Sequence, residues 1–175
     1  MQKNTKKWAM LTIFFAASVF SLTASAQEDK TKRPSPPATA SGEINGKTIT
    51  INYGQPSIKG REVWGKLVPY GQVWRAGANE ATTIEFAKDV TIEGKKLPAG
   101  KYGFFTIPNA NEWTIIFNKV PNQWGAFKYD AAQDALRVTV KPKKSKVFNE
   151  KLIYAVNKST VSLAWENTEV AFAIK

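Results

Sequence analysis

Apolar and polar residues alternate along most of this chain. In residues 48–53, TITINY, the side chains of Ile49, Ile51 and Tyr53 fall on one face, and Thr and Asn occupy the other. Successive side chains of a strand point to opposite faces, so this alternation predicts a strand with one buried face. The Asn-Gly pair at residues 45–46 precedes it and is typical of a two-residue hairpin turn, because both positions must tolerate positive φ.

The same pattern predicts eight further strands. They cover residues 81–86, 89–94, 101–107, 112–118, 135–141, 151–157, 160–165 and 169–174. Adjacent Phe104 and Phe105 place large apolar side chains on both faces of their strand, which indicates a central strand covered on both sides. Only residues 61–67 and 129–136 have the pattern of brief helical turns. We therefore expect an all-β fold, an antiparallel β-sandwich or jelly-roll-like domain of about nine strands with one or two short helical turns.

The first 26 residues predict a removable secretory signal. Lysines at positions 3, 6 and 7 precede an apolar run over residues 8–24, and Ala24-Ser25-Ala26 supplies small residues for cleavage after Ala26. The run is not followed by a cysteine, which excludes lipid attachment at that point. We expect a periplasmic or secreted protein with no transmembrane segment once residues 1–26 are removed, leaving 175 − 26 = 149 residues.

The remaining chain divides into two parts. Residues 27–38, QEDKTKRPSPPA, are charged and rich in proline, which predicts a flexible linker. We expect residues 39–175 to form a single β-sandwich domain, because a chain of this length can bury an adequate core. Within it, residues 54–79 carry little strand signal, and long connections of this kind are functional or packed by their own side chains.

Composition narrows the chemistry further. The chain has no cysteine and no histidine, which removes thiolate sites, the common triads and the commonest zinc ligand. We therefore expect no metal or other cofactor, and the sequence favours a non-catalytic role. Loss of the three signal lysines takes the net charge from +11 to +8. This excess of positive charge suits solubility or a polyanion of the cell envelope, and export argues against a nucleic acid partner.

The corner that opens the strand 81–86 holds the main candidate residues. Strand parity places Glu80 on the apolar face, where a carboxylate needs a partner, and Arg75 is the nearest candidate for a bidentate ion pair. One interpretation is a buried clamp that pins the loop. The other is a ligand site, which would be lined by Tyr70, Trp74, Arg75, Asn79 and Glu80. Structural ion pairs resemble functional ones, so both interpretations stay open.

Four further residues are secondary candidates for ligand binding. Trp64 lies in the same long connection, and its flat face suits a sugar ring, although tryptophans also plug the ends of small sandwiches. Trp124 lies outside the regular strands and is expected to be partly exposed. Lys143 and Lys144 belong to the basic run KPKKSK, which would contact phosphates or an acidic glycan, or form a solvated hairpin loop.

Several long segments resemble one bacterial family. They are IKGREVWGKLVPYGQVWRAGANEATTIEF, DVTIEGKKLPAGKYGFFTIP, EWTIIFNK, NQWGAFKYD and WENTEVAFAI, which occur in that order between Ala38 and Lys175. Together they resemble domain of unknown function 2911, and Trp74 through Glu80 match its Trp-Arg-x-Gly-Ala-Asn-Glu pattern. The resemblance implies an exported all-β domain. The family has no established activity, so it implies no catalytic residue.

Three functional hypotheses remain. The first is an exported, non-catalytic binding domain that recognises a carbohydrate or another cell-envelope component. The second is a glycan-acting hydrolase that uses carboxylates from separate segments. The third is a structural or interaction protein of the envelope, which would present an exposed apolar patch.

Overall fold

The computed structural model of the protein describes residues 29–175. The regular structure of these residues consists of antiparallel strands and two 3-10 turns, which confirms the all-β prediction. The strands are β1 (Pro37–Ile44), β2 (Lys47–Gly54), β3 (Thr82–Phe86), β4 (Val90–Ile92), β5 (Lys95–Leu97), β6 (Gly100–Ile107), β7 (Trp113–Asn118), β8 (Asp134–Val140), β9 (Lys143–Val156) and β10 (Thr160–Ala173). The turns are η1 (Lys30–Lys32) and η2 (Ala131–Gln133). The predicted signal peptide lies outside the described residues, and none of the helices within them is long and apolar enough to span a membrane.

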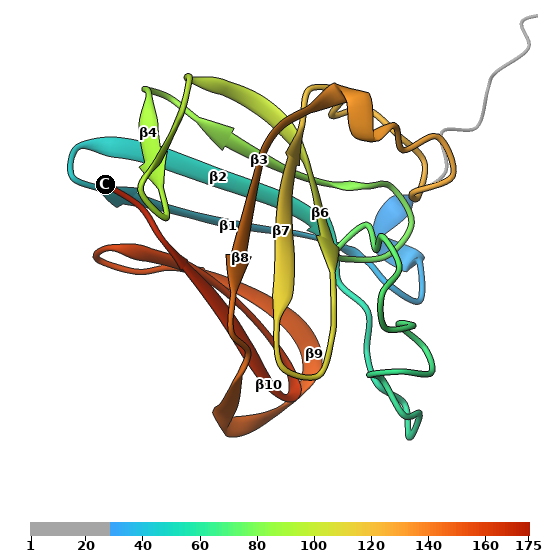
Figure 1. Ribbon diagram of the computed structural model, residues 1–175. Coiled ribbons are helices and arrows are strands. Elements are labelled where there is room, and N and C mark those ends of the chain that lie inside the picture. The colour runs from blue at the N-terminus through green and yellow to red at the C-terminus, as the bar shows by residue number, and fades with distance from the viewer. Residues whose placement is uncertain (1–28) are drawn as a thin grey trace, which may run out of the picture.

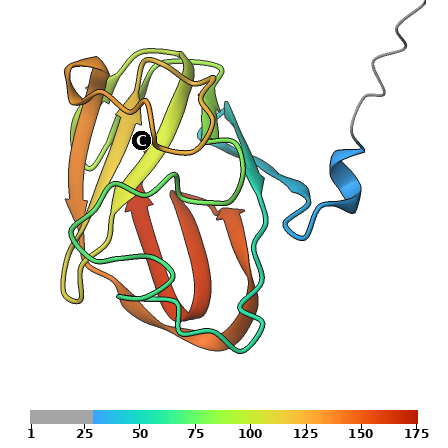
Figure 2. The same cartoon turned by 90° about the vertical axis from the view of Figure 1, so that its right-hand side faces the viewer.

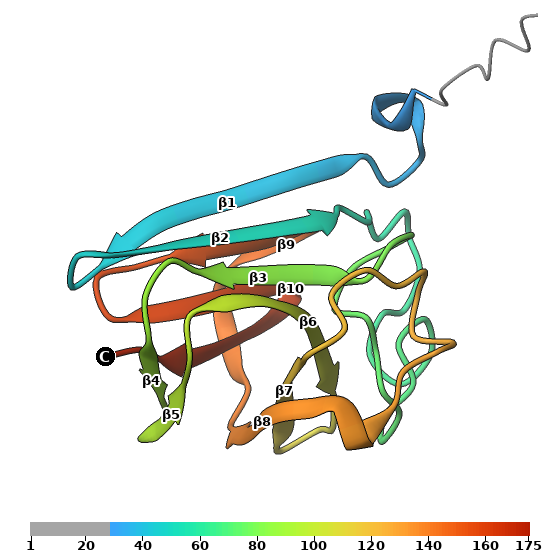
Figure 3. The same ribbon diagram turned by 90° about the horizontal axis from the view of Figure 1, so that it is seen from above.

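The strands form two layers, which Figure 1 shows from the side and Figure 3 from above. One layer is a six-stranded sheet in the order β1-β2-β3-β6-β7-β8. The other is the long β9–β10 hairpin, which crosses beneath that sheet. The small β4–β5 hairpin joins the end of β10 through a bridge between Ile92 and Ile174. Strands β1 and β2 are connected at Asn45 and Gly46, which both have positive φ, as the hairpin signal predicts.

Aromatic side chains fill the space between the two layers. Phe172 of β10 packs against Phe104 of β6 and Phe117 of β7, with ring centroids 5.8 and 5.7 Å apart. Tyr53 of β2 meets Tyr154 of β9 edge to face at 4.7 Å. Such aromatic pairs bury large apolar areas, so this interface is the main core of the domain.

Four tryptophans close one end of the core. Trp64 and Trp74 come from the long connection between β2 and β3, which runs across this end of the sandwich in Figure 2. They pack on the buried indoles of Trp113 and Trp165, and Trp64 lies 4.9 Å from Trp113. Trp74 stacks on Trp165 at 6.0 Å. The connection is therefore held by its own side chains.

The outer face of the six-stranded sheet carries a second, smaller core. Phe105 and Ile116 are fully buried there, whereas the neighbouring Phe104 faces the main core. Residues 119–130 cover this face, and Asn118 ties them down by donating to Asp130 O and accepting from Val120 N. The expectation of a central strand covered on both sides is therefore confirmed for β6.

Three local predictions differ from the structure. Residues 61–67 form turns and no helix, and of their side chains Val63 and Trp64 pack against the core whereas the other five residues are exposed. The basic run 141–146 is not a hairpin loop but lies largely within β9, where Lys143 is opposite Glu169 of β10 in the strand register. Residues 29–38 of the predicted flexible linker contain η1 and the start of β1, because contacts with Asn79 and Glu80 hold them on the domain.

Candidate functional site

The corner at residues 75–80 is anchored from inside the sandwich. The buried hydroxyl of Tyr154 donates to the carbonyl of Ala76 at 2.6 Å, and the hydroxyl of Thr82 donates to the same oxygen at 3.0 Å. Ala76 is fully buried and has φ of +52°, a conformation that costs energy for a residue with a side chain. Two hydrogen bonds to one carbonyl therefore hold the strained residue in place.

A close backbone approach fixes the corner from the other side. The amide of Ala78 donates to the carbonyl of Gly54 at 3.1 Å. A Cβ atom on Gly54 would lie only 2.1 Å from the carbonyl oxygen of Ala78. Only glycine fits at position 54, and the end of β2 thereby sets the path of the chain into β3.

The predicted ion pair between Arg75 and Glu80 is wrong. The regular alternation of β3 begins only at Thr82, and Asn79 has φ of +62°, so strand parity does not extend back to Glu80. The Glu80 side chain turns to the outer face, where it is 43% exposed. Arg75 lies beside Gly125, and its buried Nε has no hydrogen-bond partner among the described residues. Burial lowers the pKa of Arg75.

Glu80 pairs instead with two basic residues near the start of the described chain. Lys30 Nζ lies 2.7 Å from Glu80 Oε1, and Arg33 Nη1 donates to both carboxylate oxygens at 3.1 and 3.0 Å. The pKa of Glu80 is lowered to about 2, chiefly by the hydrogen bond from Lys30. Its carboxylate is therefore ionised at any neutral or mildly acidic pH.

Trp124 lies next to this carboxylate because two backbone segments pair. Gln123 O accepts from Ala81 N at 2.9 Å and Asn79 O accepts from Gly125 N at 3.1 Å, which forms a bridge between Glu80 and Trp124. The Trp124 side chain is 57% exposed, as the sequence predicts, and the Arg33 guanidinium lies 5.8 Å from its ring centroid. An aromatic face and a carboxylate thus share one rim.

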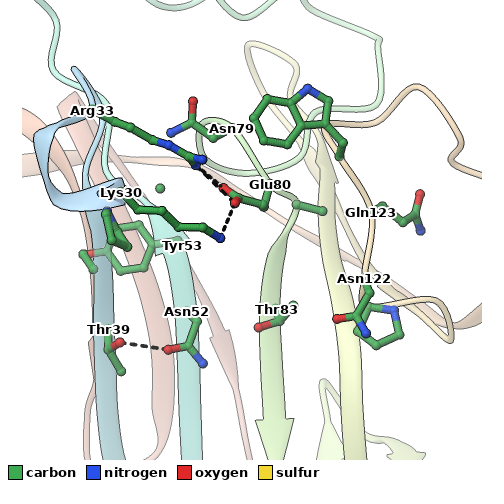
Figure 4. A pocket seen from close by; sticks show the side chains of 16 residues that line it. Lys30, Arg33, Thr39, Asn52, Tyr53, Asn79, Glu80, Thr83, Asn122 and Gln123 are labelled. Atoms are coloured by element: carbon green, nitrogen blue, oxygen red, sulfur yellow. Dashed lines mark hydrogen bonds and ion pairs between the residues drawn. The ribbon is translucent and has the colours of Figure 1, made fainter. Parts of the chain in front are cut away.

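The rim borders a pocket of about 400 Å³ on the outer face of the sheet. We call it the outer-face pocket. Its floor is formed by the outward side chains of Thr39 on β1, Asn52 on β2 and Thr83 on β3, which lie opposite one another in the register of the sheet. Figure 4 shows these side chains below Glu80, with Asn122 and Gln123 on the opposite wall. The outer-face pocket therefore combines hydroxyl, amide, carboxylate and indole groups.

Several polar groups of this pocket have no hydrogen-bond partner within residues 29–175. Thr39 donates to Asn52 Oδ1 at 2.8 Å, which leaves the Nδ2 of Asn52 as an unused donor. The Gln123 amide donates to Val120 O, but its buried Oε1 is unpaired. Asn52 is exposed, so its Nδ2 is available to a ligand. Buried polar groups are usually satisfied, so the unpaired Oε1 of Gln123 is suited to a polar ligand or ordered water.

A second hollow of about 280 Å³ lies elsewhere on the surface, at the end closed by the tryptophans. It is lined by Trp64 and Tyr70 together with Lys143 and Lys144 of β9. The indole Nε1 of Trp64 is buried without a hydrogen-bond partner among the described residues. We call this hollow the tryptophan-end hollow.

The structure divides the predicted site. Asn79 and Glu80 line the outer-face pocket with Trp124, whereas Tyr70 lines the tryptophan-end hollow, and Trp74 and Arg75 line neither. Sequence reasoning missed the pocket residues Lys30, Arg33, Thr39, Asn52, Thr83, Asn122 and Gln123. The alternation in β2 placed Asn52 on the polar face, but nothing local in the sequence indicated that the N-terminal residues return to Glu80.

These features define the class of the protein: an all-β sandwich domain with a polar pocket on its outer face. Residues 35–174 match the family model described as protein of unknown function (DUF2911), so the chain belongs to this family. No curated protein and no solved structure matches the chain. Residues 29–175 contain no group of three or more carboxylates placed to hold a metal ion.

Proposed function

We propose that the protein is an exported binding domain whose outer-face pocket takes a small polyhydroxylated ligand of the carbohydrate type. The observation that carries this proposal is that an exposed indole face, Trp124, lies at one hollow with two amide atoms that have no partner within residues 29–175, the Nδ2 of Asn52 and the Oε1 of Gln123. Sugar rings have apolar C–H faces that stack on aromatic rings and hydroxyl edges that need polar partners. The outer-face pocket offers an aromatic ring at its rim and polar partners on its floor and wall.

The pocket supports binding better than glycoside hydrolysis. Glycosidases of the common type need two carboxyl groups, one of them protonated, on either side of the scissile bond. Glu80 is the single acidic residue that lines the outer-face pocket in the described chain, and its pKa of about 2 leaves it without a proton to donate. This argues for recognition without bond cleavage.

Tryptophan fluorescence and calorimetry on the purified protein test the proposal. The probes are tetrasaccharides of glucose, mannose, N-acetylglucosamine and glucosamine. We expect at least one to bind, and Trp124→Ala to weaken that binding about tenfold, the loss that one aromatic stack amounts to. Phe127→Ala is the matched control, because Phe127 is 84% exposed in the same loop but does not line the outer-face pocket. Failure of every probe to bind, or unchanged binding by Trp124→Ala, would refute the proposal.

A further inference from the structure

The residues that precede β1 occupy one end of the outer-face pocket. We call residues 29–36 the N-terminal strap. Two of its three basic side chains, Lys30 and Arg33, make ion pairs with Glu80, and the Arg33 guanidinium also lies over the Trp124 ring. A carboxylate beside an aromatic face is a favourable arrangement for a cation, because both attract positive charge and the carboxylate also accepts its hydrogen bonds.

The part of the strap that reaches Glu80 is lightly held. The turn η1 contains no buried residue, and the Lys30 side chain is 55% exposed. The main chain of the strap is held at its other end, where Asn79 Nδ2 donates to Ser35 O at 2.9 Å and Gln55 N donates to Pro36 O at 2.8 Å. The Lys30–Glu80 pair joins two exposed groups, and such pairs contribute little stability, whereas the Arg33 side chain is only 14% exposed and is held more firmly. Lys30 can therefore exchange first, while Ser35 and Pro36 stay anchored.

We propose that Glu80 and Trp124 form a recognition site for a positively charged group of the ligand, which Lys30 and Arg33 of the N-terminal strap fill in the unliganded protein. This inference rests on the proposed function and specifies it: the carbohydrate carries a free amino group. The ammonium group would replace the strap at Glu80 and Trp124. The sugar hydroxyls would lie over the polar floor at Asn52 and Thr83.

This exchange has a thermodynamic consequence. A ligand that must displace part of the protein binds with an apparent affinity reduced by the fraction of molecules in which the site is open. Weakening the strap therefore strengthens binding of a cationic ligand. A neutral ligand that uses only the floor and the Trp124 face gains little, because it has no group that competes for Glu80.

Isothermal titration calorimetry with two tetrasaccharides tests the inference. The glucosamine tetramer is cationic at pH 5.5, whereas the N-acetylglucosamine tetramer is its neutral counterpart. In Lys30→Ala/Arg33→Ala we expect the cationic tetramer to bind about tenfold more tightly than in the wild type, because both ion pairs that compete for Glu80 are lost. Glu80→Gln should abolish the preference for the cationic over the neutral tetramer.

The control variant separates site occupancy from net charge. Lys66→Ala/Lys158→Ala also removes two positive charges, but both lysines are exposed and neither lines the outer-face pocket. Its affinity for the cationic tetramer should stay within about twofold of the wild type, since distant exposed charges are largely screened. Should the double strap variant not fold, Lys30→Ala alone is expected to give part of the same gain.

The outcomes separate the inference from the proposed function. Equal affinity of the strap variant and the wild type for the cationic tetramer overturns the inference. So does tight binding of the neutral tetramer without any preference for the cationic one, although carbohydrate binding itself would then stand. If none of the four tetrasaccharides binds to any variant, the proposed function fails and the inference fails with it.

Discussion

Removal of the Tyr154 hydroxyl is the most direct perturbation of the corner that carries Asn79 and Glu80. Tyr154→Phe keeps the ring that packs against Tyr53 at 4.7 Å and removes the hydrogen bond to Ala76 O at 2.6 Å. A typical hydrogen bond contributes about 1 kcal/mol net, and Thr82 still donates to the same carbonyl. We expect a loss of about 1 kcal/mol, or about 3 °C in Tm for a domain of this size.

The free energy of unfolding of the double variant Tyr154→Phe/Thr82→Val decides whether the two hydroxyls share one partner. Thr82→Val alone should also cost about 1 kcal/mol, because one donor to Ala76 O remains. In Tyr154→Phe/Thr82→Val the buried carbonyl loses both donors, and an unsatisfied buried polar group costs a further amount of about 1–3 kcal/mol. The double loss should therefore exceed the sum of the singles by about 1 kcal/mol or more, which marks a shared partner.

Urea unfolding followed by circular dichroism measures all four proteins of this cycle. Thr83→Val is the matched control: it removes a hydroxyl one residue away that faces the outer-face pocket and makes no hydrogen bond within residues 29–175. Its free energy of unfolding should stay within about 0.5 kcal/mol of the wild type. An additive double variant, or a Tyr154→Phe protein as stable as the wild type, would refute the anchoring of the corner through Ala76.

Three further predictions concern the same corner. Gly54→Ala should cost about 3 kcal/mol by urea unfolding, because its Cβ would lie 2.1 Å from Ala78 O; a wild-type midpoint would contradict this close approach. Arg75→Ala and Glu80→Ala should be additive within about 0.5 kcal/mol, since the two side chains do not pair, and a coupling above about 1 kcal/mol would restore the rejected ion pair. The pKa of Glu80 is lowered from 4.5 to about 2, so its ion pairs stabilise the fold above pH 4.5 and this contribution disappears as the pH falls through about 2. Stability profiles of wild type and Glu80→Gln should therefore converge near pH 2, and a constant difference down to that pH would show that ionisation of Glu80 does not stabilise the fold.

The fold was predictable because its signals are local. The Asn45-Gly46 turn and the alternation that follows it predict β2 and the hairpin turn before it without reference to the rest of the chain, whereas β1 was not among the predicted strands. The adjacent Phe104 and Phe105 likewise report a strand covered on both faces. Merging of the last two predicted strands into β10 was not predictable, because Glu166 forms a bulge with positive φ that resembles a turn in the sequence.

The candidate site was only half predictable, because it depends on long-range pairing. Asn79 and Glu80 carried a recognisable signal in the corner, and the exposure of Trp124 followed from its position outside the strands. The partner of Glu80 did not follow, because Lys30 lies 50 residues earlier in a segment whose composition predicts a linker. Proximity in sequence favoured Arg75, whereas the left-handed conformation at Asn79 turns the chain so that the two side chains do not meet.

The sequence left two interpretations of the motif from Trp74 to Glu80 open, a structural clamp and a ligand site. Different residues of the motif fit each of them. Its first half is structural: Trp74 stacks on Trp165 and the carbonyl of Ala76 is held from inside the sandwich. Its second half faces outward, where the backbone of Asn79 pairs with the Trp124 loop and Glu80 reaches the outer-face pocket. The buried half fixes the chain direction at the entrance to β3, and this direction places the carboxylate beside the indole. A substitution in the buried half should therefore change ligand binding through the position of Glu80, whereas Glu80→Gln should change binding with little effect on the core.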